Sequence, residues 1–150
     1  MSTIRITRAE ARHRADWDRL YAGYAEFYRV TQTPEMRDRV WGWIHDAAHE
    51  VEAFVAEDET GRAVGLAHFR AFARPLAAST GGYLDDLFVS PEARGLRVAD
   101  ALIEAVAEEG RRRGWTVIRW ITADDNYRGR GVYDRLATRT MWITYDKKLS

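Results

Sequence analysis

Hydrophobic residues recur with two different periods in the first third of the chain. Residues 3–8 alternate isoleucine with polar residues, which predicts a short strand. Residues 9–28 carry large apolar side chains three and four positions apart, which predicts an amphipathic helix. These side chains are Trp17, Leu20, Tyr21, Tyr24 and Phe27. A second helix is expected from Pro34 to about residue 44, because Thr33 is a good capping residue and proline is favoured at the first helical position.

The middle of the chain has the pattern of three strands. Residues 51–57 and 63–71 are rich in alanine, valine and phenylalanine, and Gly61 between them favours a hairpin. Residues 73–82, which include two glycines, are expected to form a loop. Residues 83–89 form the third predicted strand, since Ser90 and Pro91 follow it directly and end it.

The last third alternates helical and strand patterns. A helix is expected from about residue 97 to Arg113, because three arginines complement the negative end of the helix dipole and Gly114 suits the cap. A strand over 115–122, a short helix over 126–136 and a final strand over 141–145 complete the prediction. The order β-α-α-β-β-β-α-β-α-β predicts one mixed α/β (α+β) domain over residues 1–150, with helices flanking a mixed central sheet.

The charges of the chain balance, with 23 lysines and arginines against 23 acidic residues. Without a basic field, neither nucleic acid nor an acidic membrane is an expected partner. Cysteine is absent, which excludes disulfides, thiolate metal sites and cysteine nucleophiles. No apolar run approaches the roughly 18 residues of a membrane helix, and the charged N-terminus is unlike a signal peptide, so we expect a cytoplasmic protein.

Residues 83–100 predict a strand, a glycine-containing turn and a helix in direct succession. Such a turn points several backbone N–H groups at one place, and these groups have no acceptor inside the helix. The positive end of the helix dipole lies beside them, so an anionic group such as pyrophosphate is the natural ligand. The pattern therefore predicts a site for a phosphorylated cofactor.

The same segment resembles the signature of the GCN5-related N-acetyltransferase (GNAT) superfamily, Arg/Gln-x-x-Gly-x-Gly/Ala after an acidic, aromatic strand. The resemblance covers nearly the whole chain and implies the GNAT fold with acetyl-CoA as co-substrate and no metal. It implies that the pantetheine arm runs beside Leu87, Phe88 and Val89. It places the pyrophosphate on the turn formed by Arg94, Gly95, Leu96, Arg97, Val98, Ala99 and Asp100, where Asp100 opens the helix.

Arg97 departs from the resembled signature, because the family usually has its middle glycine there. Either its side chain crowds the phosphates and weakens cofactor binding, or its guanidinium adds a charge-assisted contact to them. We favour the second interpretation, in which the backbone conformation that glycine permits is not required at this position.

A second landmark lies in residues 126–136, which resemble the family segment Asn-x-x-Ala-x-x-Leu-Tyr-x-x-Leu. Gly129 replaces the usual alanine and Val132 the leucine. The resemblance implies that Asn126 contacts the pantetheine arm and that Tyr133 lies near the thioester sulfur, where a phenol can act as general acid. The alternative is that Tyr133 only covers the core and keeps its hydroxyl in water.

Asp85 matches the acidic position that polyamine acetyltransferases of this superfamily carry before the aromatic end of the strand. The resemblance implies that it accepts the proton of an attacking amine. Since successive side chains of a strand point to opposite faces, only one of Asp85 and Asp86 is expected to face the acceptor. The alternative is that both acids merely attract a cation.

Aromatic residues of the two N-terminal helices are candidates for the acceptor groove, since aromatic faces beside acids suit a cationic amine. The alternative is that they belong to the core. They are Tyr21, Tyr24, Tyr28, Trp41 and Trp43. The runs 83–89, 133–137 and 142–145 look most like the histone and polyamine acetyltransferase branch, which implies a primary amine as acceptor.

The sequence therefore predicts an N-acetyltransferase that transfers an acetyl group from acetyl-CoA to a primary amine by direct attack in a ternary complex. The acceptor is a polyamine, another small amine or a lysine side chain of a peptide, and a homodimer is compatible with the sequence. The alternative is a non-catalytic acyl-CoA sensor or protein-interaction module on the same fold. His45 and His49 have zinc-site spacing on a helix, but no third ligand accompanies them, so no metal site is expected.

Overall fold

The computed structural model describes residues 3–150. Five strands form one sheet in the order β1-β2-β3-β4-β5. They are β1 (Arg5–Arg8), β2 (Glu52–Glu57), β3 (Ala63–Arg74), β4 (Ser79–Val89) and β5 (Ile118–Arg119). The first four strands are antiparallel and β5 joins β4 in parallel. This confirms the mixed α/β sheet of the sequence prediction.

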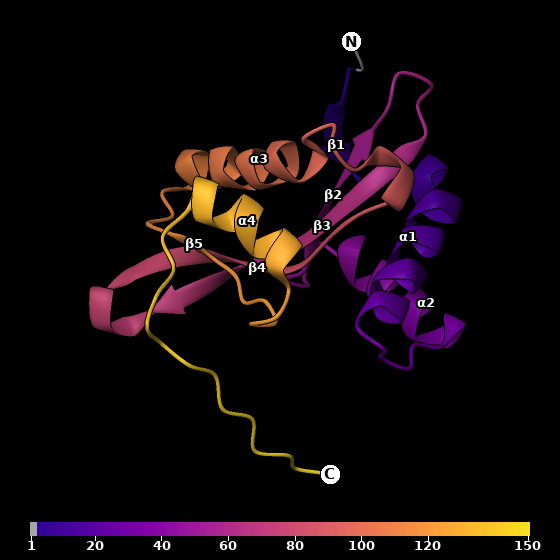
Figure 1. Cartoon of the computed structure of the whole chain (residues 1–150). Helices are drawn as coiled ribbons and strands as arrows, with labels where there is room; N and C mark the ends of the chain where they lie inside the picture. Colours follow the sequence, from indigo (N-terminus) through magenta and orange to yellow (C-terminus); the bar gives the residue numbers. More distant parts are fainter. Residues whose placement is uncertain (1–2) are drawn as a thin grey trace.

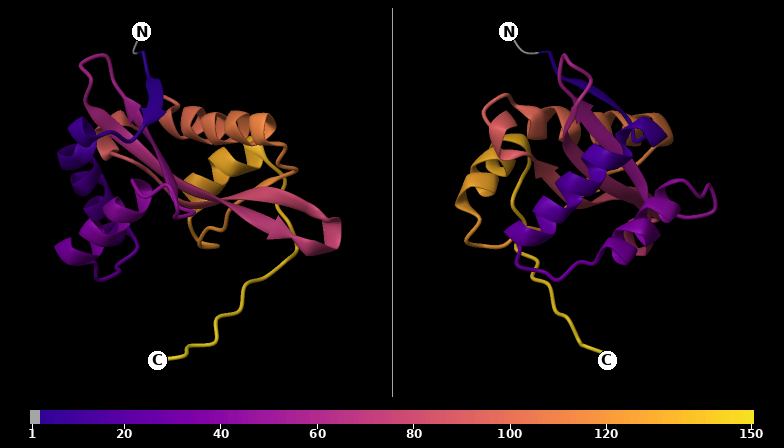
Figure 2. Two further views of the ribbon diagram at one scale, coloured as in Figure 1. Left: turned by 180° about the vertical axis from the view of Figure 1, so that it is seen from behind. Right: turned by 90° about the vertical axis from the view of Figure 1, so that its right-hand side faces the viewer.

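Helices cover both faces of the sheet (Figure 1). They are α1 (Arg14–Phe27), α2 (Pro34–Ile44), α3 (Val98–Arg113) and α4 (Tyr127–Leu136), with short 3-10 turns at Ala11–His13, Pro75–Ala77 and Pro91–Ala93. α1 and α2 lie on one face and α3 and α4 on the other, as the two further views in Figure 2 also show. None of the helices described over residues 3–150 has the length and apolarity to cross a bilayer.

Each face has its own hydrophobic core. On the α1 face, Trp17 and Leu20 pack against Val55 and Leu66, all almost fully buried. On the α3 face, Leu102 and its neighbours one turn away pack against strand residues such as Phe69 and Leu84. Because strand side chains alternate between the two faces, one sheet supports both cores.

The predicted helix ends are confirmed. Thr33 Oγ1 accepts a 3.2 Å hydrogen bond from the Met36 N–H, and Pro34 occupies the first helical position. Gly114 ends α3 with φ of 77°, a left-handed conformation that glycine adopts without a steric cost. These are local signals, so sequence alone suffices to place them.

The loop predicted over residues 73–82 is wrong, because β3 and β4 continue through it as a long hairpin. Gly82 and Gly81 suggested a loop, but both lie in β4. A Cβ on Gly82 would stand 2.5 Å from the Trp115 ring, so glycine is needed for close packing rather than for a turn. Sequence periodicity cannot show that contact between distant residues.

The strand predicted over residues 141–145 is also wrong for the single chain. After α4 the backbone is extended, but within residues 3–150 it pairs with no strand. The strand predicted over 115–122 is reduced to Ile118 and Arg119, because only these two residues align with β4.

Candidate active site

A β-bulge in the centre of β4 organises the candidate site. His68 of β3 pairs with Asp86, whereas the next residue, Phe69, pairs with Leu84, so Asp85 is an extra residue in β4. A bulge increases the local twist and bends its strand. The bulge lies two residues after Tyr83, the last residue of β4 that pairs with β5. β4 and β5 therefore diverge at this point.

The bulge also places Asp85 and Asp86 on the same face of the sheet, so the expectation that they point to opposite faces is wrong. Asp86 contacts His68 and Asp85 contacts Arg70. His68 and Arg70 are two residues apart in β3 and so share a face, the one that α1 covers. The extra residue shifts the alternation of β4 by one, which brings the two carboxylates together.

Asp86 is held by a buried chain of hydrogen bonds from α1 through β3. Trp17 Nε1–H donates to His68 Nε2 (2.9 Å), and because indole is only a donor, the proton of the neutral imidazole lies on Nδ1. His68 Nδ1–H then donates to Asp86 Oδ2 (2.8 Å), to which the Tyr21 hydroxyl also donates (2.9 Å). Burial opposes the charge of Asp86, but hydrogen bonds from His68 and from two tyrosines of α1 outweigh it and lower its pKa.

Asp85 has a different environment. Burial raises its pKa, although the Arg70 guanidinium, whose Nε lies 3.0 Å from Oδ2, acts in the opposite direction. Asp85, Asp86 and Arg70 therefore lie on one face of the sheet. When both carboxylates are ionised, these three groups together carry one negative charge. Asp85 is the more basic carboxylate of the two.

Past the bulge, β4 has an unpaired edge. Ser90 N–H donates to Val64 O of β3 (2.9 Å), and successive residues of an antiparallel strand direct their backbone groups alternately to either side. The N–H groups of Leu87 and Val89 therefore face the side from which β5 has diverged. The N–H group of Phe88 faces β3. Leu87 and Val89 leave backbone donors and acceptors for an extended molecule beside β4.

Tyr133 lies at the far side of this divergence. Its ring packs against Trp120 with centroids 5.4 Å apart, and the side chain is partly buried against the α3-face core. Burial raises the pKa of Tyr133 to about 12, and the nearby Tyr28 adds to the shift. The hydroxyl therefore keeps its proton throughout the physiological pH range.

An aromatic row on α1 connects the carboxylates with Tyr133. Tyr21 and Tyr24 have ring centroids 5.9 Å apart, and Tyr24 and Tyr28 follow at 4.9 Å. The row begins at Tyr21, which donates a hydrogen bond to Asp86. It ends at Tyr28, which helps to raise the pKa of Tyr133. The site thus runs from the acids along α1 to the tyrosine of α4.

The acceptor candidates divide into two groups. Tyr21, Tyr24 and Tyr28 form the row beside the carboxylates. Trp41 instead packs against Trp17 with ring centroids 5.0 Å apart, as part of the α1-face core. Trp43 stacks on His49 with ring centroids 4.7 Å apart.

The predicted phosphate turn leads into α3 as expected. The first helical hydrogen bond runs from Ala101 N–H to Arg97 O, so the N–H groups of Val98, Ala99 and Asp100 precede the bonded part of the helix. No side chain caps the helix at Arg97. A phosphate fits these donors at the positive end of the helix dipole.

Arg97 has φ of 57° and ψ of 34°, so the expectation that glycine's backbone freedom is not required here is wrong. A left-handed conformation costs an L-residue roughly 1–2 kcal/mol, and Arg97 adopts it where the resembled signature has glycine. The turn keeps the course that glycine would give it. The side chain is 75% exposed, with its guanidinium 3.7 Å from Asp100.

Asp100 and Asn126 are engaged by the protein itself. Arg135 of α4 donates two hydrogen bonds to Asp100, at 2.7 and 3.2 Å, and lowers its pKa. This ion pair fixes α4, and with it Tyr133, against the start of α3. Asn126 caps α4 by accepting from Gly129 N–H (3.3 Å), and it lines a hollow between the end of α1 and the start of α4.

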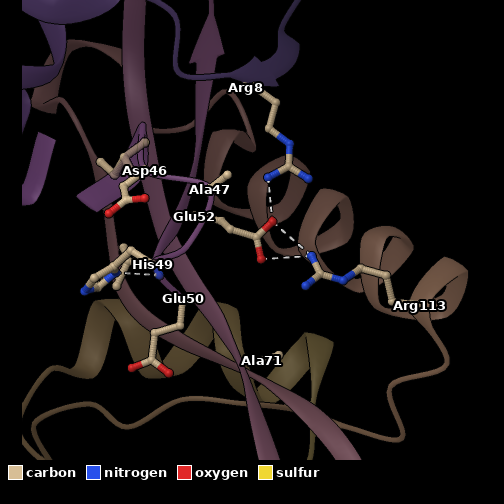
Figure 3. A pocket seen from close by; sticks show the side chains of 10 residues that line it. Arg8, Asp46, Ala47, His49, Glu50, Glu52, Ala71 and Arg113 are labelled. Carbon is tan, nitrogen blue, oxygen red and sulfur yellow. Dashed lines mark hydrogen bonds and ion pairs between the residues drawn. The ribbon is translucent and has the colours of Figure 1, made fainter. Parts of the chain in front are cut away.

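Another hollow lies beside β1 and β2, where Glu50 and Glu52 are among the residues that line it (Figure 3). Glu52 bridges Arg8 and Arg113 there, and Glu109 contacts the same two arginines, so two acids balance two cations. The histidines with zinc-site spacing have structural roles instead. His45 Nε2 lies 3.0 Å from Ala9 O, and His49 Nδ1 accepts from Val51 N–H. Over residues 3–150 no cluster of metal-ligating side chains occurs.

Sequence reasoning missed His68, Arg70 and the role of Asp86. One signal was available, since His68 is the only ionisable residue between Ala63 and Phe69 in an otherwise apolar strand. A buried polar residue in such a run needs a partner. The partner itself depends on the bulge, which the sequence does not show.

Comparison with known proteins gives a consistent result. The family model described as the acetyltransferase (GNAT) family matches residues 17–137. The D-amino-acid N-acetyltransferase HPA3 of Saccharomyces cerevisiae is 26% identical over 145 residues, covering 96% of this chain and 90% of that protein.

Solved structures share the fold over the full length of the chain. The aminoglycoside N-acetyltransferase AAC(6')-Iy in complex with CoA superposes with a TM-score of 0.85 at 21% identity, covering 100% of this chain and 97% of that one. A ribosomal-protein-alanine N-acetyltransferase from Brucella melitensis gives 0.81 at 22% identity, covering 98% and 99%. A probable acetyltransferase gives 0.85 at 26% identity, covering 97% and 98%.

Replacing Arg97 by glycine should raise the free energy of unfolding by about 0.5–1 kcal/mol, because glycine adopts positive φ without a Cβ clash. Arg97→Ala is the matched control, since it removes the same side chain but keeps the strained backbone, and it should not stabilise the protein. Chemical denaturation measures both variants. Equal stabilities of the two variants would contradict the strain.

Asp86→Asn should destabilise the fold at neutral pH by roughly 2–3 kcal/mol, because charged hydrogen bonds to a buried group are lost. The folded-state pKa of Asp86 lies below its unfolded value, so its ionised form stabilises the fold above about pH 4. That contribution is lost as the pH falls through the folded-state pKa. The difference between wild type and variant should therefore be constant above about pH 5 and shrink below it.

Asp85→Asn is the control, because the pKa of Asp85 is raised and its pH term has the opposite sign. Denaturation series between about pH 3 and pH 7 measure both differences. The assignment of the two carboxylates is wrong if the two difference curves have the same slope.

Proposed function

The chain belongs to the acetyltransferase (GNAT) family, and from that premise we propose that it transfers an acetyl group from acetyl-CoA to the primary amine of a cationic acceptor. The observation that carries the proposal is the bulge at Asp85, which opens the edge of β4 and sets two carboxylates beside it. The open edge suits the extended part of the cofactor, and the acids suit an amine.

The cofactor residues of the proposal follow the geometry of the turn and the strand. The N–H groups at the start of α3 would hold the phosphates, next to Gly95 with φ of 88° and open space where a Cβ would stand. The edge groups of Leu87 and Val89 would bond the pantetheine arm as a neighbouring strand would. The same N–H groups would stabilise negative charge that develops on the thioester oxygen.

The remaining roles concern protons. Asp85 would take the proton of the attacking amine, directly or through water, because its raised pKa makes it the better base of the two acids. Tyr133 would protonate the departing thiolate, since its hydroxyl keeps its proton at neutral pH. Asp86 would stay ionised and attract the cation. Positioning both reactants side by side supplies further acceleration.

A cationic acceptor is favoured by charge. The yeast relative is named for D-amino acids and a structural neighbour for aminoglycosides, which both carry amino groups. In this chain two carboxylates share one arginine, so an acceptor with a second positive charge gains more than a zwitterion. The tyrosine row adds aromatic faces for an ammonium group.

The alternative function is that of a non-catalytic acyl-CoA sensor. The sequence feature that favours it is Arg97, which stands where the family usually has glycine. The turn nevertheless keeps its course, so we prefer the enzyme. A thiol-release assay with acetyl-CoA distinguishes the two, because a sensor binds acetyl-CoA without releasing the thiol.

A panel of diamines, polyamines, aminoglycosides, D-amino acids and lysine peptides tests the acceptor class. Thiol release should be fastest, by at least about tenfold in kcat/KM, with acceptors that carry a second positive charge. Asp86→Asn should reduce this preference, whereas Glu59→Gln, at an exposed position in the loop between β2 and β3, should preserve it. If D-amino acids are the best substrates, the charge argument is wrong while the acetyltransferase assignment stands.

Tyr133→Phe should lower kcat by about 100-fold or more, because the proton donor is lost while the ring remains. The affinity for acetyl-CoA, measured by isothermal titration, should stay within about twofold. Tyr127→Phe is the control, since this hydroxyl belongs to an exposed side chain of the same helix. An unchanged kcat in Tyr133→Phe would remove the residue from the mechanism.

A further inference from the structure

The hydrogen bond between Trp17 and His68 has a fixed direction. Both side chains are buried, with Trp17 0% and His68 1% exposed, so no water competes for the Nε2 atom of His68. Indole has one N–H group and no acceptor, so it can only donate, and Nε2 can only accept. A tyrosine, serine or histidine in the place of the tryptophan could also accept a hydrogen bond and would allow a proton on Nε2. The tryptophan excludes that proton.

The direction of this bond determines the charge of the imidazole. An imidazolium ion carries a proton on both ring nitrogens, and the proton on Nε2 would face the indole N–H, whose nitrogen lies 2.9 Å away. His68 is therefore held as the neutral tautomer that donates from Nδ1 to Asp86 Oδ2, at 2.8 Å. In other proteins a histidine beside a carboxylate often takes a second proton and forms an ion pair. Here Asp86 receives a hydrogen bond but no neutralising charge.

The titratable and charged groups around His68 come from α1, β3 and β4. From α1, the Tyr21 ring lies edge-on to the imidazole with centroids 4.6 Å apart, and its hydroxyl donates to Asp86. From β4, Asp86 is bonded to His68, and the charge of Asp85 also interacts with the imidazole. Within β3, Arg70 is engaged by Asp85, with its Nε 3.0 Å from Oδ2. The residue opposite His68 in β2 is an alanine. The group that occupies Nε2 is the indole of α1.

We propose that Trp17 is a positioning residue for acceptor recognition, which keeps His68 neutral so that Asp86 retains its charge for an ammonium group of the acceptor. The inference rests on the proposed function, because it concerns the binding of a cationic acceptor. Asp85, Asp86 and Arg70 together carry one negative charge, and an imidazolium at His68 would cancel it. Trp17 acts through His68, from the core of the α1 face and without touching the acceptor.

Nitrogen NMR of ¹⁵N-labelled histidine tests the first step of the proposal. At about pH 6.5, His68 of the wild type should have a protonated Nδ1 and a bare Nε2. In Trp17→Phe, which removes the donor, both nitrogens should be protonated, because the carboxylate of Asp86 then gains an ion pair. His68→Gln identifies the signals of this residue among the four histidines of the chain. An imidazolium in the wild type would overturn the proposal, as would an unchanged bare Nε2 in Trp17→Phe.

Acceptor kinetics test the consequence. At about pH 6.5, Trp17→Phe should raise the KM for the diamine putrescine about tenfold over wild type, with kcat within about twofold, because the site has lost its excess charge. At about pH 8.5, where the imidazole is neutral, the ratio of the two KM values should return toward one. A merely structural role of Trp17 predicts the same ratio at both pH values, and that result would contradict the proposal. Trp41→Phe is the matched control, since it truncates a second indole of the same core and leaves the bond from Trp17 to His68 in place.

Two further variants keep the test decisive if Trp17→Phe destabilises the fold. Benzothienylalanine in place of Trp17 keeps the shape of the ring and removes the N–H group alone, so it should reproduce the pH-dependent rise in KM. In the double variant Trp17→Phe/His68→Gln, residue 68 cannot become charged, so its KM should equal that of His68→Gln at both pH values. A further rise in the double variant would show that Trp17 acts by another route.

The proposed function and this inference fail separately. If no amine is acetylated, the proposed function is wrong, and the nitrogen signals of His68 still report whether Trp17 keeps the imidazole neutral. Isothermal titration of putrescine into wild type and Trp17→Phe then replaces the kinetics. Equal affinities of the two proteins at about pH 6.5 would overturn the inference.

Discussion

The extra residue in β4 is the constraint on which the rest of the site depends. Without Asp85 as a bulge, β3 and β4 would pair regularly, and two neighbouring acids would point to opposite faces. With it, both carboxylates face α1, and β4 bends away from β5 after Tyr83. One local irregularity thus supplies the acids and exposes the backbone groups of Leu87 and Val89.

The fold stabilises the two acids in different ways. Asp86 has no cation at hydrogen-bond distance, so its charge depends on neutral donors from α1 and β3, including His68 and Tyr21. Such donors stabilise an anion without cancelling its field, which leaves it able to attract a cation. Asp85 is paired with Arg70 instead. A chain with no net charge therefore carries a local excess of one negative charge where the acceptor is proposed to bind.

The sequence predicted those features whose physical cause is local. The capping residue Thr33, the terminal Gly114 and the turn before α3 depend on a few neighbouring residues, and all three were predicted correctly. The errors share a different cause. Gly82 is required by the distant Trp115, and Asp85 is displaced by its pairing with β3. The left-handed Arg97 follows from the geometry between β4 and α3, and no propensity of arginine predicts it.

β5 connects the site with the edge of the molecule. On its inner side it pairs with β4 at only two residues, because the divergence that opens the site removes the rest of the ladder. Trp120, which follows directly, supports the ring of Tyr133. A two-residue ladder is weak support for a proposed catalytic group, since short strand pairs are barely stable alone. The support of Tyr133 therefore comes from side chains, the Trp120 ring and the ion pair between Arg135 and Asp100, more than from the ladder of β5.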